Sequence, residues 1–275
     1  MKSFKISGNS GLPITFDFHF SDSKSEAPVI VFLHGFKGFK DWGQWPLMAK
    51  VLSDKGFNVL RMNFSHNGTT PETPIDFTDL EAFGNNTFSK EVQDVTDVLD
   101  WLHSENEISS GIDLSKIHLL AHSRGGAIAL VSANEDPRVS RVATLSGVGD
   151  LVRFSEKELA FWKQKGVAFS MNGRTQQQMP MYYSLAEDYL ANEDRFAPQK
   201  VVQSLTQPYL IIHAENDETV LLHEAEQMNR LGGSSTLVVI KDANHAFGGG
   251  HPFEKHVLPE HTQKSVFHIV EFFNR

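Results

Sequence analysis

One short stretch constrains the fold of this chain more than any other: Leu119-Leu120-Ala121-His122-Ser123-Arg124-Gly125-Gly126. The mostly apolar residues 116–121 predict a buried strand, and the apolar residues 127–131 predict a helix. A serine lies between them, with a small residue two positions away on either side. A turn this tight strains the serine backbone and pushes its hydroxyl outward, and large side chains at positions 121 and 125 would collide with the neighbouring strand and helix. The stretch therefore predicts a nucleophile elbow with Ser123 at its tip, in which Ala121 stands where glycine is usual.

Strands alternate with helices along most of the chain. Residues 3–7 and 14–20 predict an N-terminal hairpin around the turn at 8–11. Further strands are predicted at 28–33, 57–64, 116–121, 139–145, 209–214 and 236–240, helices at 44–55, 89–103, 219–231 and 262–273, and a long polar loop at 65–88. This alternation is typical of an α/β fold, in which right-handed crossovers join a mostly parallel sheet with helices on both faces.

Candidate catalytic side chains follow several of the predicted strands. Asp217 comes directly after the strand at 209–214, and His245 comes shortly after the strand at 236–240. Open α/β sheets place their sites at the carboxyl ends of strands, so both side chains are expected near Ser123. A serine hydroxyl is a weak nucleophile, which needs an imidazole to accept its proton and a carboxylate to orient that imidazole. Ser123, Asp217 and His245 therefore form a candidate triad, in the chain order that accompanies a nucleophile elbow.

Two backbone amides are candidates for stabilising an oxyanion. Phe36, in the His34-Gly35-Phe36 turn after the strand at 28–33, and Arg124, next to the serine, are expected to donate them to a carbonyl oxygen that gains negative charge. The His34 side chain is expected to brace this turn, and His122 to pack beneath the elbow. For the Arg124 side chain, a substrate contact and a charge at the rim both stay open.

The position of the acid has alternatives in the sequence. Asp150 also follows a predicted strand and is the main rival of Asp217. Asp242 lies close to His245 in sequence, but it is expected to serve a turn.

Residues 151–206 interrupt the alternation of strands and helices. The segment contains predicted helices at 156–165 and 181–191 and no strand-like run. We therefore expect a core made of residues 1–150 and 207–275, and a short helical cap inserted at 151–206 on the side of the sheet that carries Ser123. The cap aromatics Trp162, Tyr182 and Tyr183 are candidate substrate-binding residues, although packing is the more usual role of such side chains.

On these motifs the sequence resembles the α/β-hydrolase superfamily. The resemblance spans essentially the whole chain and is carried by residues 34–36, the elbow at 121–126, Asp217 and Asn244-His245. It looks closest to the small bacterial enzymes related to dienelactone hydrolases and to cinnamoyl or feruloyl esterases, which carry a similar oxyanion turn and a short cap. The resemblance implies an α/β-hydrolase fold with a sheet of the eight-stranded type. Ala214 departs from the glycine that the family often has there, which affects turn geometry rather than chemistry.

Composition narrows the range of partners and cofactors that this chain is expected to bind. A net charge of −9 disfavours nucleic acid, and the absence of cysteine excludes disulfides, thiolate metal sites and a cysteine nucleophile. No apolar run approaches the roughly 20 residues that span a bilayer, so we expect a cytoplasmic protein with no membrane span. We expect neither a cofactor nor a metal, since His251, His256 and His261 are spaced five apart rather than four. The oligomeric state stays open.

Two classes of function fit these features. The first is a serine hydrolase that cleaves a small acyl or aryl ester through an acyl-enzyme, with thioesters and amides as alternative substrates. The second is a non-catalytic ligand-binding protein on the same fold, which would be expected to have lost part of the triad.

Overall fold

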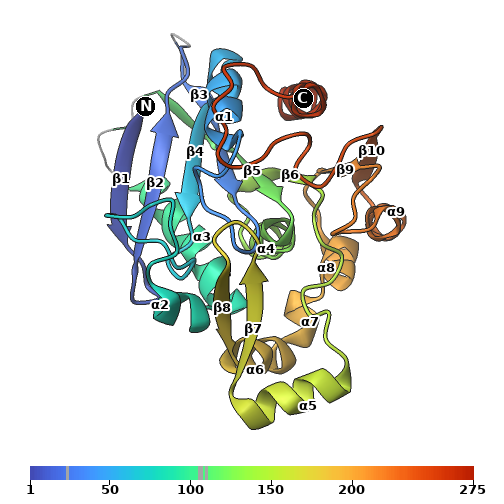
Figure 1. Cartoon of the computed structure of the whole chain (residues 1–275). Coiled ribbons are helices and arrows are strands. Elements are labelled where there is room, and N and C mark those ends of the chain that lie inside the picture. Colours follow the sequence, from blue (N-terminus) through green and yellow to red (C-terminus); the bar gives the residue numbers. More distant parts are fainter. Residues whose placement is uncertain (23–24, 105–107, 109–110) are drawn as a thin grey trace.

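An eight-stranded sheet forms the centre of the molecule, in the order β1-β2-β4-β3-β5-β6-β9-β10 (Figure 1). The computed structural model describes residues 1–22, 25–104, 108 and 111–275. The strands of this sheet are β1 (Lys2–Ser7), β2 (Pro13–His19), β3 (Ala27–Leu33), β4 (Asn58–Asn63), β5 (Ile112–His122), β6 (Val139–Leu145), β9 (Tyr209–Ala214) and β10 (Ser235–Ile240). β2 is antiparallel to β1 and β4, and the other neighbours are parallel. The predicted mostly parallel sheet is confirmed.

Helices cover both faces of this sheet (Figure 1). α1 (Trp45–Asp54) and α10 (Glu260–Phe273) pack on one face, and α3 (Phe88–His103), α4 (Arg124–Glu135), α8 (Pro198–Ser204) and α9 (Leu222–Leu231) pack on the other. Along β3, Val29 and Val31 enter one core while Ile30 and Phe32 enter the other, because successive side chains of a strand point to opposite faces. This double burial explains the unbroken apolar run of the strand. None of the helices in the described ranges is long and apolar enough to cross a membrane.

The 151–206 segment is where expectation and structure differ most. It contains α5 (Glu156–Lys165), α6 (Ser184–Ala191) and α7 (Glu193–Phe196), and its last helix, α8, packs on the core. It also contains an antiparallel hairpin of β7 (Val167–Asn172) and β8 (Gln177–Tyr182). The expectation of a purely helical segment without strands is therefore wrong, and the helix predicted from residue 181 begins at Ser184.

The local sequence explains why this hairpin escaped prediction. α5 begins at a capping box between Ser155 and Glu158 and ends at Gly166, whose φ of 75° is the left-handed conformation that glycine adopts easily. The chain then enters a two-stranded sheet in which both strands are edges, so Pro180 is tolerated in β8. The apolar side chains of β7 do not mark a buried face: Phe169 and Met171 are 58% and 46% exposed.

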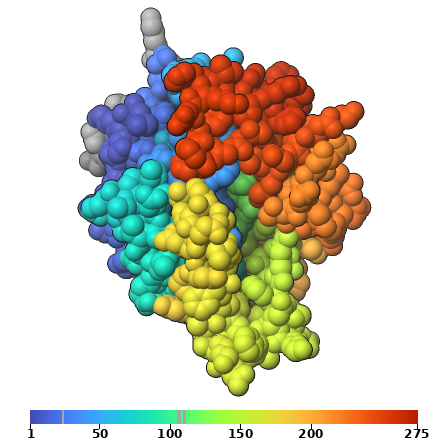
Figure 2. Space-filling view, in the orientation of Figure 1, coloured from blue at the N-terminus to red at the C-terminus, as the bar shows by residue number. Residues whose placement is uncertain are grey.

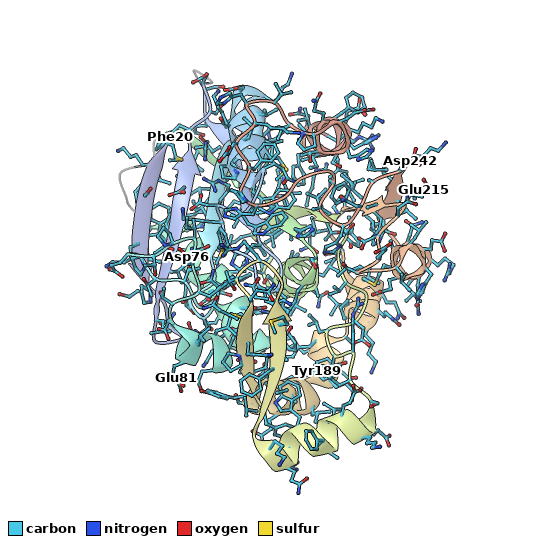
Figure 3. The ribbon with its side chains drawn as sticks, viewed as in Figure 1. Phe20, Asp76, Glu81, Tyr189, Glu215 and Asp242 are labelled. Atoms are coloured by element: carbon cyan, nitrogen blue, oxygen red, sulfur yellow. The ribbon has the colours of Figure 1, made fainter. Side chains whose placement is uncertain are left out.

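The segment 65–88, predicted as a loop, contains the short helix α2 (Leu80–Gly84). The hairpin packs against this segment. The Tyr182 hydroxyl donates to Glu81 Oε2 at 2.5 Å (Figure 3 labels Glu81), and Arg174 donates to the Ile75 carbonyl at 3.0 Å. A Cβ on Gly84 would lie 2.9 Å from the Tyr182 ring, so only glycine allows this close approach. These contacts fix the hairpin beside α2, below the middle of the sheet in Figure 1.

Candidate active site

Ser123 lies at the turn between β5 and α4, as the sequence predicted. Its backbone has φ 56° and ψ −125°, a strained conformation for a residue other than glycine. The turn is held because the Ser123 amide donates to the Leu145 carbonyl of β6 at 3.0 Å. A Cβ on Gly125 would lie only 2.5 Å from the His34 carbonyl oxygen, so glycine is required where α4 meets the end of β3.

Three side chains from separate strand ends form one hydrogen-bonded chain. His245 Nε2 lies 3.1 Å from Ser123 Oγ, and His245 Nδ1 lies 2.7 Å from Asp217 Oδ2. An ionised carboxylate accepts only, so Nδ1 carries the proton in this pair and Nε2 is left to accept from the serine hydroxyl. The structure therefore brings together the three residues of the candidate triad in a geometry suited to proton transfer.

The surroundings of Asp217 keep its carboxylate charged. Burial of the Asp217 side chain opposes ionisation, but hydrogen bonds from His245 and the Val220 amide outweigh it and hold the pKa of the carboxyl well below its usual range. The amides of Thr219 and Val220 both donate to Oδ1 at 2.9 Å, which fixes the carboxylate and leaves Oδ2 for the histidine. Asp217 is therefore held as an anion that can accept a hydrogen bond from His245 Nδ1.

Asp217, and neither of the two rival acids, is the carboxylate bonded to His245. Asp150 is exposed and accepts from the Val152 amide at 3.0 Å. Asp242 is exposed at the outer edge of the sheet, where its amide donates to Glu215 (Figure 3). Neither carboxylate replaces Asp217 beside His245.

The turn that contains Phe36 lies against the serine. A Cβ on Gly35 would lie 2.9 Å from Ser123 Cβ, so the turn approaches the elbow as closely as glycine permits. Gly38 donates its amide to the Gly35 carbonyl at 3.0 Å and closes the turn. Arg124 opens α4, where the first amides of a helix have no partner within the helix. Both candidate oxyanion residues thus flank Ser123.

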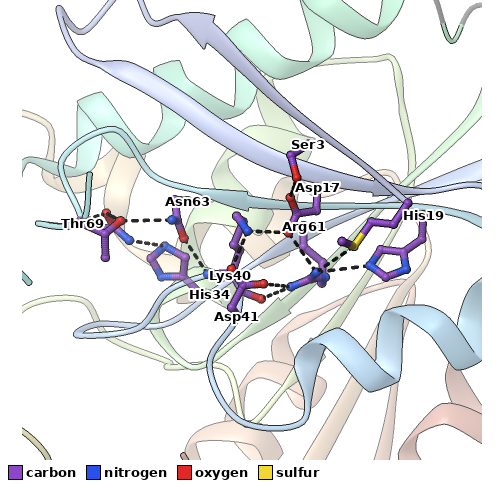
Figure 4. Close-up of polar contacts among 11 residues, drawn as sticks. Ser3, Asp17, His19, His34, Lys40, Asp41, Arg61, Asn63 and Thr69 are labelled. Atoms are coloured by element: carbon purple, nitrogen blue, oxygen red, sulfur yellow. Dashed lines mark hydrogen bonds and ion pairs between the residues drawn. The ribbon is translucent and has the colours of Figure 1, made fainter. Parts of the chain in front are cut away.

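A buried polar network supports this turn from behind (Figure 4). His34 Nδ1 lies 2.9 Å from the Gly35 carbonyl, Asn67 Nδ2 lies 3.3 Å from the Gly38 carbonyl, and the Lys40 amide donates to Asn63 Oδ1 at 2.6 Å. Lys40 also belongs to a buried ionic cluster that holds this part of the chain against the sheet. It consists of Asp17, Lys40, Asp41 and Arg61. His34 therefore contacts the turn that contains Phe36, the candidate oxyanion residue, within a network that the sequence pattern did not reveal.

The Arg124 side chain is not an unpaired charge at the rim of the site. Its Nη2 donates to Glu91 Oε1 at 2.5 Å, and Glu91 is only 2% exposed. The guanidinium also lies over the Phe36 ring, with Cζ 4.5 Å from the ring centroid, a cation–π distance. One side chain thus covers the ring of Phe36, the other candidate oxyanion residue.

Lys37 connects the oxyanion turn to the hairpin. It has a φ of 56°, and its Nζ donates to Ser170 Oγ at 3.1 Å and to the Met171 carbonyl at 2.8 Å. Partial burial lowers the pKa of this amine. The turn beside Ser123 and strand β7 are therefore joined directly.

A cavity of about 380 Å³ opens beside Ser123. Its wall is mostly apolar and combines core residues with residues of the 151–206 segment. The segment contributes Phe154, Phe169, Met181 and Leu185, among others. Figure 2 shows the surface hollowed between the yellow hairpin and the yellow-green chain that leads into α5. The size and lining are those of a small-molecule site.

The structure does not place the three predicted cap aromatics on this cavity. Trp162 is buried, and its Nε1 donates to the Met181 carbonyl at 2.8 Å. Tyr183 packs edge-on against Trp162, and Tyr182 turns to Glu81. These rings fill the interior and flank of the segment because each finds a local partner. The cavity residues Phe154 and Leu185 were missed by sequence reasoning; the outward-facing alternation of β7 was the signal for Phe169.

Buried neutral histidines around the elbow give a testable pH dependence of stability. Burial lowers the pKa of His34 to about 4 and that of His122 to about 3, and it lowers the pKa of His118 to about 4. As the pH falls, these histidines take up protons in the unfolded chain, whereas the buried imidazoles of the folded chain stay neutral. The free energy of unfolding should therefore fall below pH 6.5, by up to about 1.4 kcal/mol per histidine for each pH unit until the folded pKa is reached. Urea titrations at pH 7 and pH 5 measure this loss.

A substitution of His118 isolates this pH effect, and the carboxyl group of Asp94 opposes it. His118 stacks on Phe273 with a centroid distance of 4.6 Å, so His118→Phe should reduce the loss between pH 7 and pH 5 while keeping the packing. Burial raises the pKa of Asp94 to about 7, so this group is protonated in the folded state and offsets part of the loss. An unfolding free energy equal at the two pH values in both proteins would contradict the assignment of neutral buried histidines.

Known proteins resemble this chain in sequence and in structure. The model of the Alpha/beta hydrolase family matches residues 30–255. The sn-1-specific diacylglycerol lipase ABHD11 of Danio rerio is 27% identical over 128 residues, which cover 46% of this chain and 33% of that protein. The chain therefore matches only about a third of the length of this curated relative.

Solved structures match over nearly the full length. Est1E from Butyrivibrio proteoclasticus, solved with ferulic acid bound, has a TM-score of 0.75 at 17% identity, with 98% of both chains covered. Dienelactone hydrolase from Anabaena variabilis has a TM-score of 0.65 at 18% identity, with 99% of this chain and 97% of that chain covered. At these identities the likeness shows the fold.

Proposed function

Because this chain belongs to the alpha/beta hydrolase family, we propose that it is a serine hydrolase that cleaves a carboxylic ester through an acyl-enzyme intermediate. The observation that carries the proposal is the hydrogen-bonded chain from Ser123 Oγ through His245 to Asp217. Ser123 lies at the wall of an apolar cavity with room for a small acyl or aryl ester. The suspected kinship with feruloyl esterases and dienelactone hydrolases is confirmed at the level of the superfamily.

In the proposed reaction Ser123 Oγ attacks the ester carbonyl while His245 Nε2 takes its proton. Asp217 holds the imidazole and stabilises the imidazolium that forms. The amides of Phe36 and Arg124 receive the negative charge on the carbonyl oxygen. His245 then gives the proton to the leaving alcohol, and the same groups activate a water that releases the acid. The residues 151–206 act as a cap that supplies much of the pocket wall.

Other substrates and roles would use the same groups differently. A thioester or amide could be attacked by the same serine, and a binding protein would need none of the proton transfer. The intact Ser-His-Asp chain favours catalysis over binding alone. A burst of nitrophenol from p-nitrophenyl acetate, followed by steady turnover, tests the proposal, since a binder gives neither. We propose a small-molecule ester as the partner, and no cofactor.

The salt bridge behind the oxyanion turn gives a test of positioning. Glu91→Gln removes the charge that holds the Arg124 guanidinium over the Phe36 ring. We expect kcat to fall roughly ten- to a hundredfold with KM little changed, because small misplacements of groups that act in the transition state are costly. Steady-state kinetics on p-nitrophenyl butyrate measure the two parameters.

A matched control exists on the surface. Glu135→Gln breaks the pair between Glu135 and Arg195, whose Nε lies 2.6 Å from Glu135 Oε1 and which is partly exposed. This variant should leave both parameters unchanged, since exposed pairs contribute little. If Glu91→Gln raised KM alone, the pair would serve substrate binding and not the oxyanion turn.

A further inference from the structure

A second cavity, of about 570 Å³, adjoins the first and is lined by residues 154–169 of the 151–206 segment. It lies between α5 and β7, at the bottom of Figure 1. The two cavities share two side chains, Phe154 and Phe169, which line both. We call the second one the tail cavity. Its floor comes from Phe161 and Trp162 of α5 and from Val167 and Ala168 of β7.

The tail cavity offers apolar surface and few polar partners. The one polar atom of Trp162 is already bonded to the Met181 carbonyl. Of the charged residues at its rim, Glu158 caps α5 by accepting from the Ser155 amide at 2.8 Å, and Lys157 is exposed. A ligand in this cavity would therefore gain mainly from contact with aliphatic or aromatic carbon.

The phenylalanines along this path are unusually exposed for their size. Phe154 is 36% exposed, Phe169 58% and Phe161 60%. Single exposed apolar residues are ordinary on a protein surface, but a contiguous group beside a pocket marks a binding surface. Because the group begins at the wall of the Ser123 cavity, its occupant is most simply an extension of whatever binds at Ser123.

We propose that the substrate carries an unbranched aliphatic chain that leaves the Ser123 cavity between Phe154 and Phe169 and ends in the tail cavity. This inference rests on the proposed esterase function and makes its substrate class an ester of a medium- or long-chain fatty acid or fatty alcohol. A compact aryl ester would fill the first cavity alone. Each methylene that enters apolar surroundings should raise kcat/KM by about three- to fourfold until the chain fills both cavities.

The test compares chain lengths in a matched pair of variants. Phe161→Asp puts a charge into the tail cavity from the exposed face of α5, whereas Phe267→Asp changes a phenylalanine that is 58% exposed on α10. For p-nitrophenyl esters from acetate to dodecanoate, below their critical micelle concentrations, wild type should favour the long chains. The ratio of kcat/KM for dodecanoate to that for acetate should fall at least tenfold in Phe161→Asp and stay within twofold in Phe267→Asp. Alkyl acetates of the same lengths show whether the chain belongs to the acid or to the alcohol.

The outcomes separate this inference from the function on which it rests. Two results would contradict binding of the chain in the tail cavity without contradicting the esterase function. One is a wild-type kcat/KM that does not rise beyond butyrate, and the other is a Phe161→Asp variant that lowers kcat/KM equally for all chain lengths. If no ester were turned over, calorimetric titration with dodecanoate would decide: binding at least tenfold weaker in Phe161→Asp supports the cavity, and equal binding overturns it. A change of oligomeric state in Phe161→Asp with an unchanged length profile would assign the exposed rings to a second copy of the chain and overturn it too.

Discussion

Replacing Ser123 with alanine is expected to lower kcat for ester hydrolysis by about 10⁴-fold or more, because the groups of a triad act as a unit. The substitution removes only the hydroxyl that lies 3.1 Å from His245 Nε2. It leaves the backbone of the elbow, which is held by the Leu145 carbonyl and by the close packing at Gly125. Initial rates with p-nitrophenyl butyrate, and thermal unfolding of the same samples, measure both expectations.

Chemical labelling provides the complementary control. A serine-reactive phosphonate should modify Ser123 in the wild-type protein and leave the alanine variant unlabelled. Ser146 is a useful comparison, because it also follows a strand and has a positive φ of 48°, but it is fully buried. Purified Ser123→Ala protein that retained wild-type turnover would rule out the proposed mechanism.

Asp217→Asn is expected to lower kcat by about 10³- to 10⁴-fold, because an amide at this position no longer holds the required tautomer of the histidine. The wild-type carboxylate accepts two amides at Oδ1 and His245 Nδ1 at Oδ2, so it has no ambiguity of orientation. An asparagine can present its NH₂ group to Nδ1, and the imidazole proton then moves to Nε2, where it blocks acceptance from Ser123. Steady-state kinetics at a pH above 7 measure the loss.

Asp150→Asn is the matched control for this substitution. Asp150 lines the same cavity as Ser123 but is exposed and bonded to the Val152 amide. We expect a change of kcat of less than tenfold, whatever its effect on KM. A larger loss in Asp150→Asn than in Asp217→Asn would move the acid to the end of β6 and contradict the assignment.

The sheet and the triad could be predicted because both depend on properties of single strands. β3, β9 and the second half of β5 are buried on both faces, so their sequences are mostly apolar runs that end where the chain leaves the core. Ser123 and Asp217 follow such runs directly or within a few residues, and His245 follows the edge strand β10. Parallel strands bring their carboxyl ends to one edge, so the order along the chain was enough to expect the three side chains together.

The pocket wall could not be predicted in the same way, because it depends on side chains that meet across separate segments. Tyr182 looks like a ligand contact in a sequence, yet its hydroxyl donates to Glu81. Trp162 donates to the Met181 carbonyl and lines the tail cavity, not the cavity beside Ser123. The pairing of Arg124 with Glu91 joins residues 33 positions apart on two helices, which no local pattern records. The hairpin β7–β8 was missed because β7 exposes its large apolar side chains and β8 contains a proline.

The hydrogen bonds of Lys37 give the architecture a mechanical consequence. The Lys37 amine, next to Phe36, donates to the Met171 carbonyl of β7. Tyr182 and Arg174 bond the other side of the hairpin to the 65–88 segment. Near the start of the 151–206 segment, the partly exposed Arg153 side chain also pairs with Glu224 at 2.7 Å. Because the hairpin is held on two sides, we expect the 151–206 segment to keep its position when a ligand binds. Under the proposed function, an ester would then enter through an opening that already exists, and the shape of that opening would select it without a closing movement.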